Sequence, residues 1–124
     1  MPLTTVLFVE DEEAVLNAIS ELLRAHDYTV LEARNVLQAL ETCATYPDAI
    51  NLLLTDVIMP GMNGVDLAKR VRALRPDIKV LYTSGYGQLA LQRRGVSSDT
   101  VHLPKPFTEE ELLLRVRQAL EASG

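Results

Sequence analysis

The chain has little cysteine, no long apolar run and no excess of basic residues, and each shortage excludes a class of protein. Cys43 is the single cysteine among 124 residues, which excludes an internal disulfide framework and indicates a reducing compartment. The apolar runs are far too short to cross a bilayer, and the first residues lack the basic and apolar regions of a signal peptide. We therefore expect a cytoplasmic protein that makes no membrane contact.

The charge and hydropathy of the chain indicate a folded domain that does not bind nucleic acid. The 17 Asp and Glu residues outnumber the 12 Lys and Arg residues, and a net charge of -5 disfavours contact with a phosphate backbone. Hydrophobic residues make up 48% of the chain, which is enough for a buried core. Because no repeat, low-complexity segment or linker divides the sequence, we expect one domain over residues 1–124.

Short apolar segments alternate with amphipathic segments along the whole chain. The apolar segments predict strands at residues 5–9, 28–33, 51–55, 78–82 and 101–103. The amphipathic segments predict helices at residues 13–26, 35–46, 65–74 and 85–94, and a last helix that follows residue 108. This alternation predicts an α/β fold with a doubly wound, five-stranded parallel sheet. Polar residues in the second and fifth strands place both at the edges, which favours the flavodoxin-like (βα)5 strand order 2-1-3-4-5.

Capping residues and apolar spacing describe the helices further. Asn35 followed by Gln38, and Thr108 followed by Glu111, are typical of helix N-termini. The helix at 85–94 is poor in apolar positions, so we expect it to be the least stable element, and Cys43 is interpreted as a small core residue. The residues predicted to face the core are Val15, Ala18, Ile19, Leu22 and Leu23 in the first helix, Leu37, Leu40 and Ala44 in the second, and Leu67, Val71 and Leu74 in the third.

Chemically active side chains follow the predicted strands at their carboxyl ends, where open parallel sheets bind their ligands. In strand order these residues are Glu10 with Asp11, Asp56, Thr83 and Lys105. Clustered carboxylates repel one another unless a cation neutralises them, and an all-oxygen set suits magnesium better than zinc. Asp56 can attack phosphorus to form an acyl phosphate, with Lys105 and Thr83 holding phosphoryl oxygens.

Four stretches together resemble the receiver domain of bacterial response regulators, the superfamily that includes the chemotaxis response regulator. They are VLFVEDEEAVL at the first strand, LLLTDVIMPGMNG around Asp56, VLYTSGY at the fourth strand and LPKPF before the last helix. The resemblance covers nearly the whole chain and implies phosphorelay, or two-component, signal transduction. It implies that Asp56 accepts a phosphoryl group from a phosphohistidine on a sensor histidine kinase or a histidine phosphotransfer protein.

The resemblance also implies a magnesium site beside the phosphoacceptor. Asp11, Asp56 and the main-chain carbonyl of Ile58 would bind Mg²⁺ directly, while Glu10, which replaces the commoner Asp, would act through water. Ile58 and Gly85 occupy two variable positions where other family members carry polar groups that help to position a hydrolytic water. Since neither residue has such a group, we predict a long-lived acyl phosphate.

A conformational switch is implied as well. The resemblance implies that Lys105 pairs with the phosphoryl group and that Thr83 moves toward this group to form a hydrogen bond with it. It also implies that the peptide bond between Lys105 and Pro106 is cis. The output face would be the fourth helix, the fifth strand and the fifth helix, through which phosphorylation could drive a homodimer. His102 stands where the family usually has Tyr or Phe, which leads to the hypothesis that His102 makes the response sensitive to pH near neutrality.

Several alternatives to a free-standing regulator remain open at this point. TSGY and LPKPF are typical of receivers in hybrid sensor histidine kinases, so the chain could be such a domain, acting as a phosphate relay or sink. A phosphorylation-independent interaction domain typically lacks the acids or the lysine, which are present here. A phosphatase of the haloacid dehalogenase type needs a second acid at Ile58, and a flavodoxin needs a neutral loop in place of the acids. A receiver would catalyse only its own phosphorylation and dephosphorylation.

Overall fold

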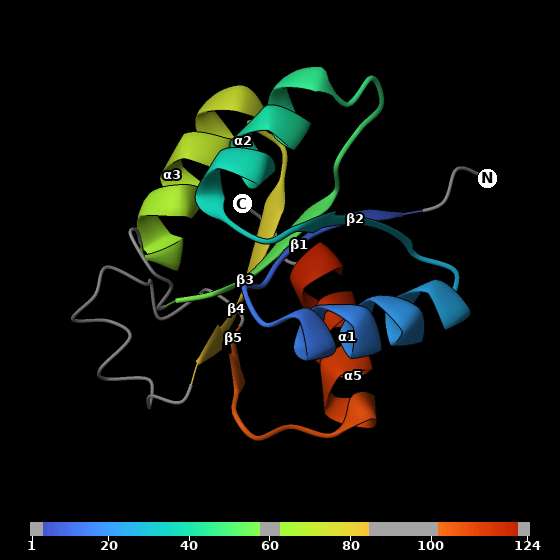
Figure 1. Ribbon diagram of the computed structural model, residues 1–124. Coiled ribbons are helices and arrows are strands. Elements are labelled where there is room, and N and C mark those ends of the chain that lie inside the picture. Colours follow the sequence, from blue (N-terminus) through green and yellow to red (C-terminus); the bar gives the residue numbers. More distant parts are fainter. Residues whose placement is uncertain (1–3, 58–62, 85–101, 122–124) are drawn as a thin grey trace.

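The computed structural model describes residues 4–57, 63–84 and 102–121, which form an open sheet with helices on both sides (Figure 1). Every strand pairs in parallel with its neighbours, in the order β2-β1-β3-β4-β5. The strands are β1 (Thr5–Val9), β2 (Thr29–Ala33), β3 (Leu52–Asp56), β4 (Lys79–Ser84) and β5 (His102–Pro104). The predicted flavodoxin-like order is confirmed, with the two more polar strands at the edges, where each pairs with only one other strand of the described ranges.

Helices cover the two faces of the sheet in pairs. α1 (Glu13–Ala25) and α5 (Glu109–Glu121) pack on one face, and α2 (Val36–Thr45) and α3 (Gly64–Leu74) pack on the other (Figure 1). The helix predicted at 85–94 lies outside the described residues. None of the helices in the described ranges is long and apolar enough to span a membrane.

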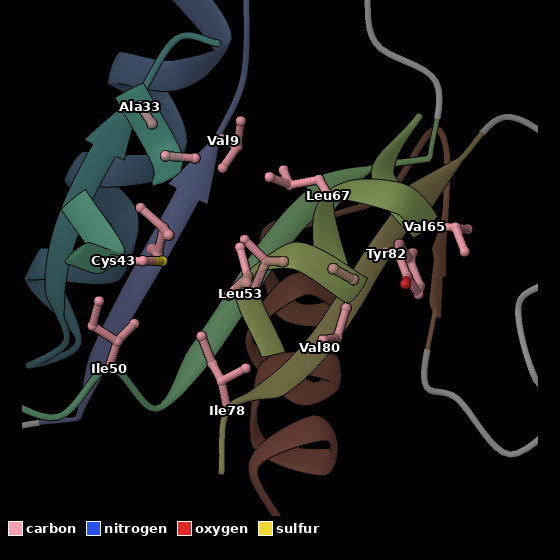
Figure 2. Close-up of a cluster of buried hydrophobic side chains, with 14 of the residues drawn as sticks. Val9, Ala33, Cys43, Ile50, Leu53, Val65, Leu67, Ile78, Val80 and Tyr82 are labelled. Atoms are coloured by element: carbon pink, nitrogen blue, oxygen red, sulfur yellow. The ribbon is translucent and has the colours of Figure 1, made fainter. Parts of the chain in front are cut away.

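Two clusters of buried side chains hold these layers together. The cluster between the sheet and the α2–α3 pair includes Leu53, Val80 and Tyr82 (Figure 2). The cluster between the sheet and the α1–α5 pair includes Phe8 and Leu54. Because adjacent residues of a strand point to opposite faces, the buried apolar residues of β1 and β3 supply both clusters.

The helix N-termini follow the predicted capping chemistry. Asn35 Oδ1 accepts a hydrogen bond from the Gln38 amide at 2.9 Å, which satisfies one of the first amides of α2. At α5, the Thr108 hydroxyl accepts from the Glu111 amide and the Glu111 carboxylate accepts from the Thr108 amide, both at 3.1 Å. This reciprocal pair is the predicted capping box.

The face of α2 that meets the sheet differs from the predicted one. Ala39 and Cys43 are buried, whereas Leu37 is 67% exposed and Ala44 is also exposed. Leu40 is half-buried. The prediction is therefore wrong for Leu37 and Ala44, because the helix is turned so that Ala39 and Cys43 meet the sheet, while Leu40 packs against the buried cluster as predicted. The prediction of Cys43 as a core residue is confirmed.

The predicted inner faces of α1 and α3 are confirmed in part. Leu23 in α1 and Val71 in α3 are fully buried. Ala18 is exposed, whereas Leu16, which was not among the predicted residues, is buried in α1. Leu74, the last residue of α3, is 48% exposed.

Candidate functional site

The carboxyl ends of four strands place polar side chains on one side of the sheet. Phe8, Leu54, Leu81 and Leu103 all belong to the cluster beneath α1 and α5. Since side chains alternate along a strand, the residue two positions after each of them continues on the same side. These residues are Glu10, Asp56, Thr83 and Lys105. Strand register and side-chain parity thus bring the predicted strand-end residues to a common place.

Asp56 and Lys105 form an ion pair across 49 residues of sequence. Lys105 Nζ lies 2.6 Å from Asp56 Oδ2, and the two side chains are 39% and 21% exposed. Burial by itself lowers the pKa of Lys105, but the hydrogen bond and charge of Asp56, with the charges of Glu10 and Glu12, outweigh it and raise the pKa above its ordinary value. Lys105 therefore stays charged beside a carboxylate that a reactant can reach.

Glu10 is the most buried acid of the site, at 7% exposure. Its Oε1 accepts a hydrogen bond from the Glu12 amide at 3.2 Å, and its own amide donates to the Ala33 carbonyl at 3.0 Å. Burial raises the pKa of Glu10, the bond from Glu12 opposes that shift, the neighbouring Asp11 adds to it, and Lys105 opposes it. The negatively charged forms of Glu10 and Asp11 thus repel each other, and a bound cation would reduce this repulsion.

Thr83 lies beside Asp56 on the neighbouring strand. The two residues pair in the β3–β4 register, and the Thr83 side chain is buried at 5% exposure. The Thr83 carbonyl accepts a hydrogen bond from the Val57 amide at 3.1 Å. This bond ties the backbone just after Asp56 to β4.

Gly64 at the start of α3 packs directly against the backbone of Asp56. A Cβ atom built at this position would overlap the Asp56 carbonyl oxygen and would lie 3.1 Å from the Val57 Cα. The Gly64 amide also donates to the Val57 carbonyl at 2.6 Å. In the sequence, Gly64 only ends the stretch LLLTDVIMPGMNG around Asp56, and no single-sequence signal reports which backbone a glycine will approach.

The oxygen atoms of the site fit a hard cation. Glu10, Asp11 and Asp56 carry carboxylates, with no cysteine or histidine among them, and such a donor set suits Mg²⁺. Within the described ranges no three His, Cys, Asp or Glu side chains are arranged as a ready metal site. Ile58, whose carbonyl is the remaining predicted ligand, lies outside those ranges.

The remaining predicted site features lie on and after β5. The Lys105-Pro106 peptide bond is cis. His102 pairs in register with Tyr82 and is half-buried. Burial, with a contribution from the charge of Arg115, lowers the pKa of His102 below its ordinary value of 6.5. Any change of its charge therefore falls on the acid side of neutrality.

Comparisons with known proteins identify the family of the chain. The family model of the response regulator receiver domain matches residues 6–117. Sensor kinase CckA of Brucella abortus (strain 2308) is 37% identical over 118 residues, which cover 94% of this chain and 12% of that protein. Response regulator receiver protein CpdR of the same strain is 30% identical over 119 residues, covering 95% of this chain and 98% of that protein. The chain spans about half the length of several other relatives that it matches.

A solved structure shows the same fold. The receiver domain of the hybrid histidine kinase CckA superposes with a TM-score of 0.79 at 38% identity, covering 94% of this chain and 99% of that one. Receiver domains act in two-component signalling with histidine kinases or phosphotransfer proteins, and they generally bind Mg²⁺ at the phosphorylation site. They are not enzymes in the ordinary sense. With a family match over most of its length and this fold, the chain belongs to the response regulator receiver domain family.

Proposed function

We propose that this chain is a magnesium-dependent phosphorelay receiver whose phosphoacceptor is Asp56. The observation that carries the proposal is the Asp56 carboxylate at the carboxyl edge of the sheet, 21% exposed and 2.6 Å from Lys105. The phosphoryl group would come from a phosphohistidine on a sensor histidine kinase or a histidine phosphotransfer protein. We place this domain in the cytoplasm.

In the transfer, a carboxylate oxygen of Asp56 forms a bond to phosphorus while the bond between phosphorus and the donor's imidazole nitrogen breaks. The electron pair of the broken bond returns to the imidazole, and the product is an aspartyl phosphate. The Lys105 ammonium, 2.6 Å from Asp56 Oδ2, would stabilise negative charge on a phosphoryl oxygen, and the Thr83 hydroxyl would donate to another such oxygen.

We assign the metal site to Asp11 and Asp56, with Glu10 acting through water and the main-chain carbonyl of Ile58 as a further ligand. The repulsion between the negative charges of Glu10 and Asp11 supports this assignment, because a bound cation would reduce that repulsion. A bound Mg²⁺ supplies positive charge to the phosphoryl oxygens during transfer. Lys105 would orient the Asp56 carboxylate through their ion pair, and the partial burial of both side chains excludes part of the solvent.

The new dianion at Asp56 would then act as a conformational signal. Thr83 is next to Asp56 on β4, and His102 is opposite Tyr82 on β5, so a movement of Thr83 would be transmitted along β4 toward β5. We propose that this changes the face around β5 and α5 and allows a phosphorylation-dependent homodimer. A pH effect of His102 on the response is expected below neutrality, where the lowered pKa places its titration.

Two architectures are compatible with this chemistry, and each has a relative. The similarity to part of the sensor kinase CckA supports a receiver in a hybrid kinase, acting as a relay or a sink. The similarity to CpdR over nearly its whole length supports a free-standing regulator. The lifetime of the acyl phosphate stays a prediction, because Ile58 and Gly85 lie outside the described residues. Polar substitutions at both positions should accelerate dephosphorylation.

The direct test is incubation with acetyl phosphate, with Mg²⁺ or with a chelator, followed by intact-mass measurement. Wild type should gain one phosphoryl group only with Mg²⁺, and Asp56→Asn should gain none. Asp77→Asn, which changes an exposed aspartate on the opposite edge of the sheet, is the matched control and should behave as wild type. A folded wild type that gains nothing, or an Asp56→Asn variant that is still modified, would contradict the proposal.

A further inference from the structure

Thr55 places a hydroxyl inside an apolar layer, directly behind the phosphoacceptor. Its side chain is completely buried, on the face of β3 that bears Leu53 and Val57. Its partners in register are Val9 on β1 and Tyr82 on β4, and these four neighbours all belong to the cluster of Figure 2. A valine has nearly the same shape as threonine and suits such surroundings better, because a buried hydroxyl loses its water. Packing alone therefore does not account for threonine here.

The Thr55 hydroxyl acts on the backbone of the next residue. Its Oγ1 donates to the carbonyl oxygen of Asp56 at 3.2 Å. That carbonyl belongs to the peptide group between Asp56 and Val57, and the N–H of the same group donates to Thr83 at 3.1 Å. The α-carbon of Gly64 packs against this carbonyl so closely that a Cβ there would overlap it. Thr55, Thr83 and Gly64 thus hold one peptide group from three directions.

This peptide group controls where the reactive carboxylate lies. The Asp56 side chain leaves the backbone on the face of the sheet opposite to the Thr55 side chain, and its Oδ2 meets Lys105 at 2.6 Å. A displacement of the peptide group would carry the Asp56 Cα with it, and the carboxylate attached to that atom would move relative to the ammonium. Displacements of an ångström at reacting atoms change rates strongly, so a fixed peptide group favours transfer.

We propose that Thr55 is a positioning residue for the phosphorylation of Asp56, acting through its hydrogen bond to the Asp56 carbonyl. The proposal rests on the proposed function. Thr55 does not touch the phosphoryl donor, since it lies buried on the other face of the sheet. Its contribution is to the rate of transfer and not to the binding of the donor.

The test compares Thr55→Val with Thr55→Ser in phosphorylation by acetyl phosphate at saturating Mg²⁺. Thr55→Val should lower the maximal rate about fivefold, as expected for one net hydrogen bond, with an unchanged half-saturating donor concentration. Thr55→Ser keeps the hydroxyl and should restore most of the rate. Thr5→Val, at a buried threonine near the amino end of β1, is the matched control and should leave the rate unchanged.

Hydrogen exchange of the Val57 amide gives a second readout that needs no phosphorylation. This amide should exchange faster in Thr55→Val, because its peptide group is less firmly held, while the Glu10 amide, bonded to Ala33, should not change. A Thr55→Val variant with the wild-type rate overturns the proposal. So does a slow variant with unchanged Val57 exchange, or a Thr55→Ser variant as slow as Thr55→Val.

The two proposals fail in different ways. If wild type takes no phosphoryl group, the proposed function fails, and the Val57 exchange alone decides about Thr55. Faster exchange in Thr55→Val then supports the positioning of the peptide group, and unchanged exchange overturns it. If wild type is phosphorylated on Asp56 but Thr55→Val is unaffected, only the inference about Thr55 fails.

Discussion

Replacing Gly64 with alanine should damage both the stability and the chemistry of the domain. The added Cβ would overlap the Asp56 carbonyl oxygen and would lie 3.0 Å from the Asp56 carbonyl carbon. These neighbours are backbone atoms, which cannot rotate away as a side chain can. Overpacking of this kind costs about 1–3 kcal/mol, and the better helix propensity of alanine returns at most about 1 kcal/mol. The difference is a net loss of up to about 2 kcal/mol in the free energy of unfolding, and we expect a value near 2 kcal/mol because the backbone atoms at the contact cannot move aside.

To avoid the overlap, the backbone of Asp56 would have to move, and its carboxylate would then move relative to Lys105. A misplacement on the order of 1 Å can reduce a rate by about 100-fold, so Gly64→Ala should be phosphorylated by acetyl phosphate at least about tenfold more slowly. Stability is measured by urea unfolding followed by circular dichroism, and modification by intact mass. The substitution Ala73→Gly at an exposed position of α3 is the control, and it should lower the free energy of unfolding by about 1 kcal/mol through helix propensity alone.

The reasoning about Gly64 is refuted by a stable and active alanine variant. If Gly64→Ala unfolds at the same urea concentration as wild type or a higher one, the close approach to Asp56 does not limit the side chain at this position. If it is destabilised but phosphorylated at the wild-type rate, the contact with Asp56 supports the fold without setting the position of the carboxylate.

Three further predictions concern stability and can be measured by urea unfolding. Ser20 is fully buried in α1 with no hydrogen-bond partner for its hydroxyl within the described ranges, so Ser20→Ala should stabilise the domain by about 1 kcal/mol; a loss of stability would contradict this. Asp27 has a φ of 69° after the end of α1, a conformation that favours glycine, and its negative charge is unfavourable at the carboxyl end of a helix. Asp27→Gly should therefore also stabilise the domain by about 1 kcal/mol. Asp27→Asn removes the charge alone and so separates its effect from that of the conformation. Burial and the charge of Arg115 lower the pKa of His102, so the folded state binds fewer protons than the unfolded chain, and stability falls as the pH decreases through 6.5. His102→Gln should flatten this dependence of stability on pH, and His26→Gln is the control for losing a histidine. An unchanged dependence in His102→Gln would refute the assignment.

The fold could be predicted because its signals are local and repeated. Each apolar segment is followed by an amphipathic one, and the caps at Asn35 and Thr108 depend on residues only three positions away. The edge positions of β2 and β5 followed from their polar residues, since a central strand is covered on both faces. These features need no knowledge of distant contacts.

The inner faces of the helices could be predicted only in part. Periodicity places apolar residues on a stripe, but the angle at which a helix meets the sheet selects which edge of the stripe is buried. In α2 this selected Ala39 and Cys43 and left Leu37 at the surface. A helix with apolar residues over a broad arc offers several such orientations of similar energy.

Sequence patterns were enough to predict the order of the elements, the parallel sheet and the residues at the strand ends, because strand alternation and helix capping depend on neighbours along the chain. The distances at the site, in contrast, depend on how the elements pack together. It brought Lys105 to 2.6 Å from Asp56, and it pressed Gly64 and the Thr55 hydroxyl against the Asp56 carbonyl. The Lys105 and Gly64 contacts depend on how β5 and α3 dock against β3, and the direction of the Thr55 hydroxyl depends on the rotamer that its packed neighbours allow. Packing of the whole domain sets these relations, and no local pattern in the sequence encodes them.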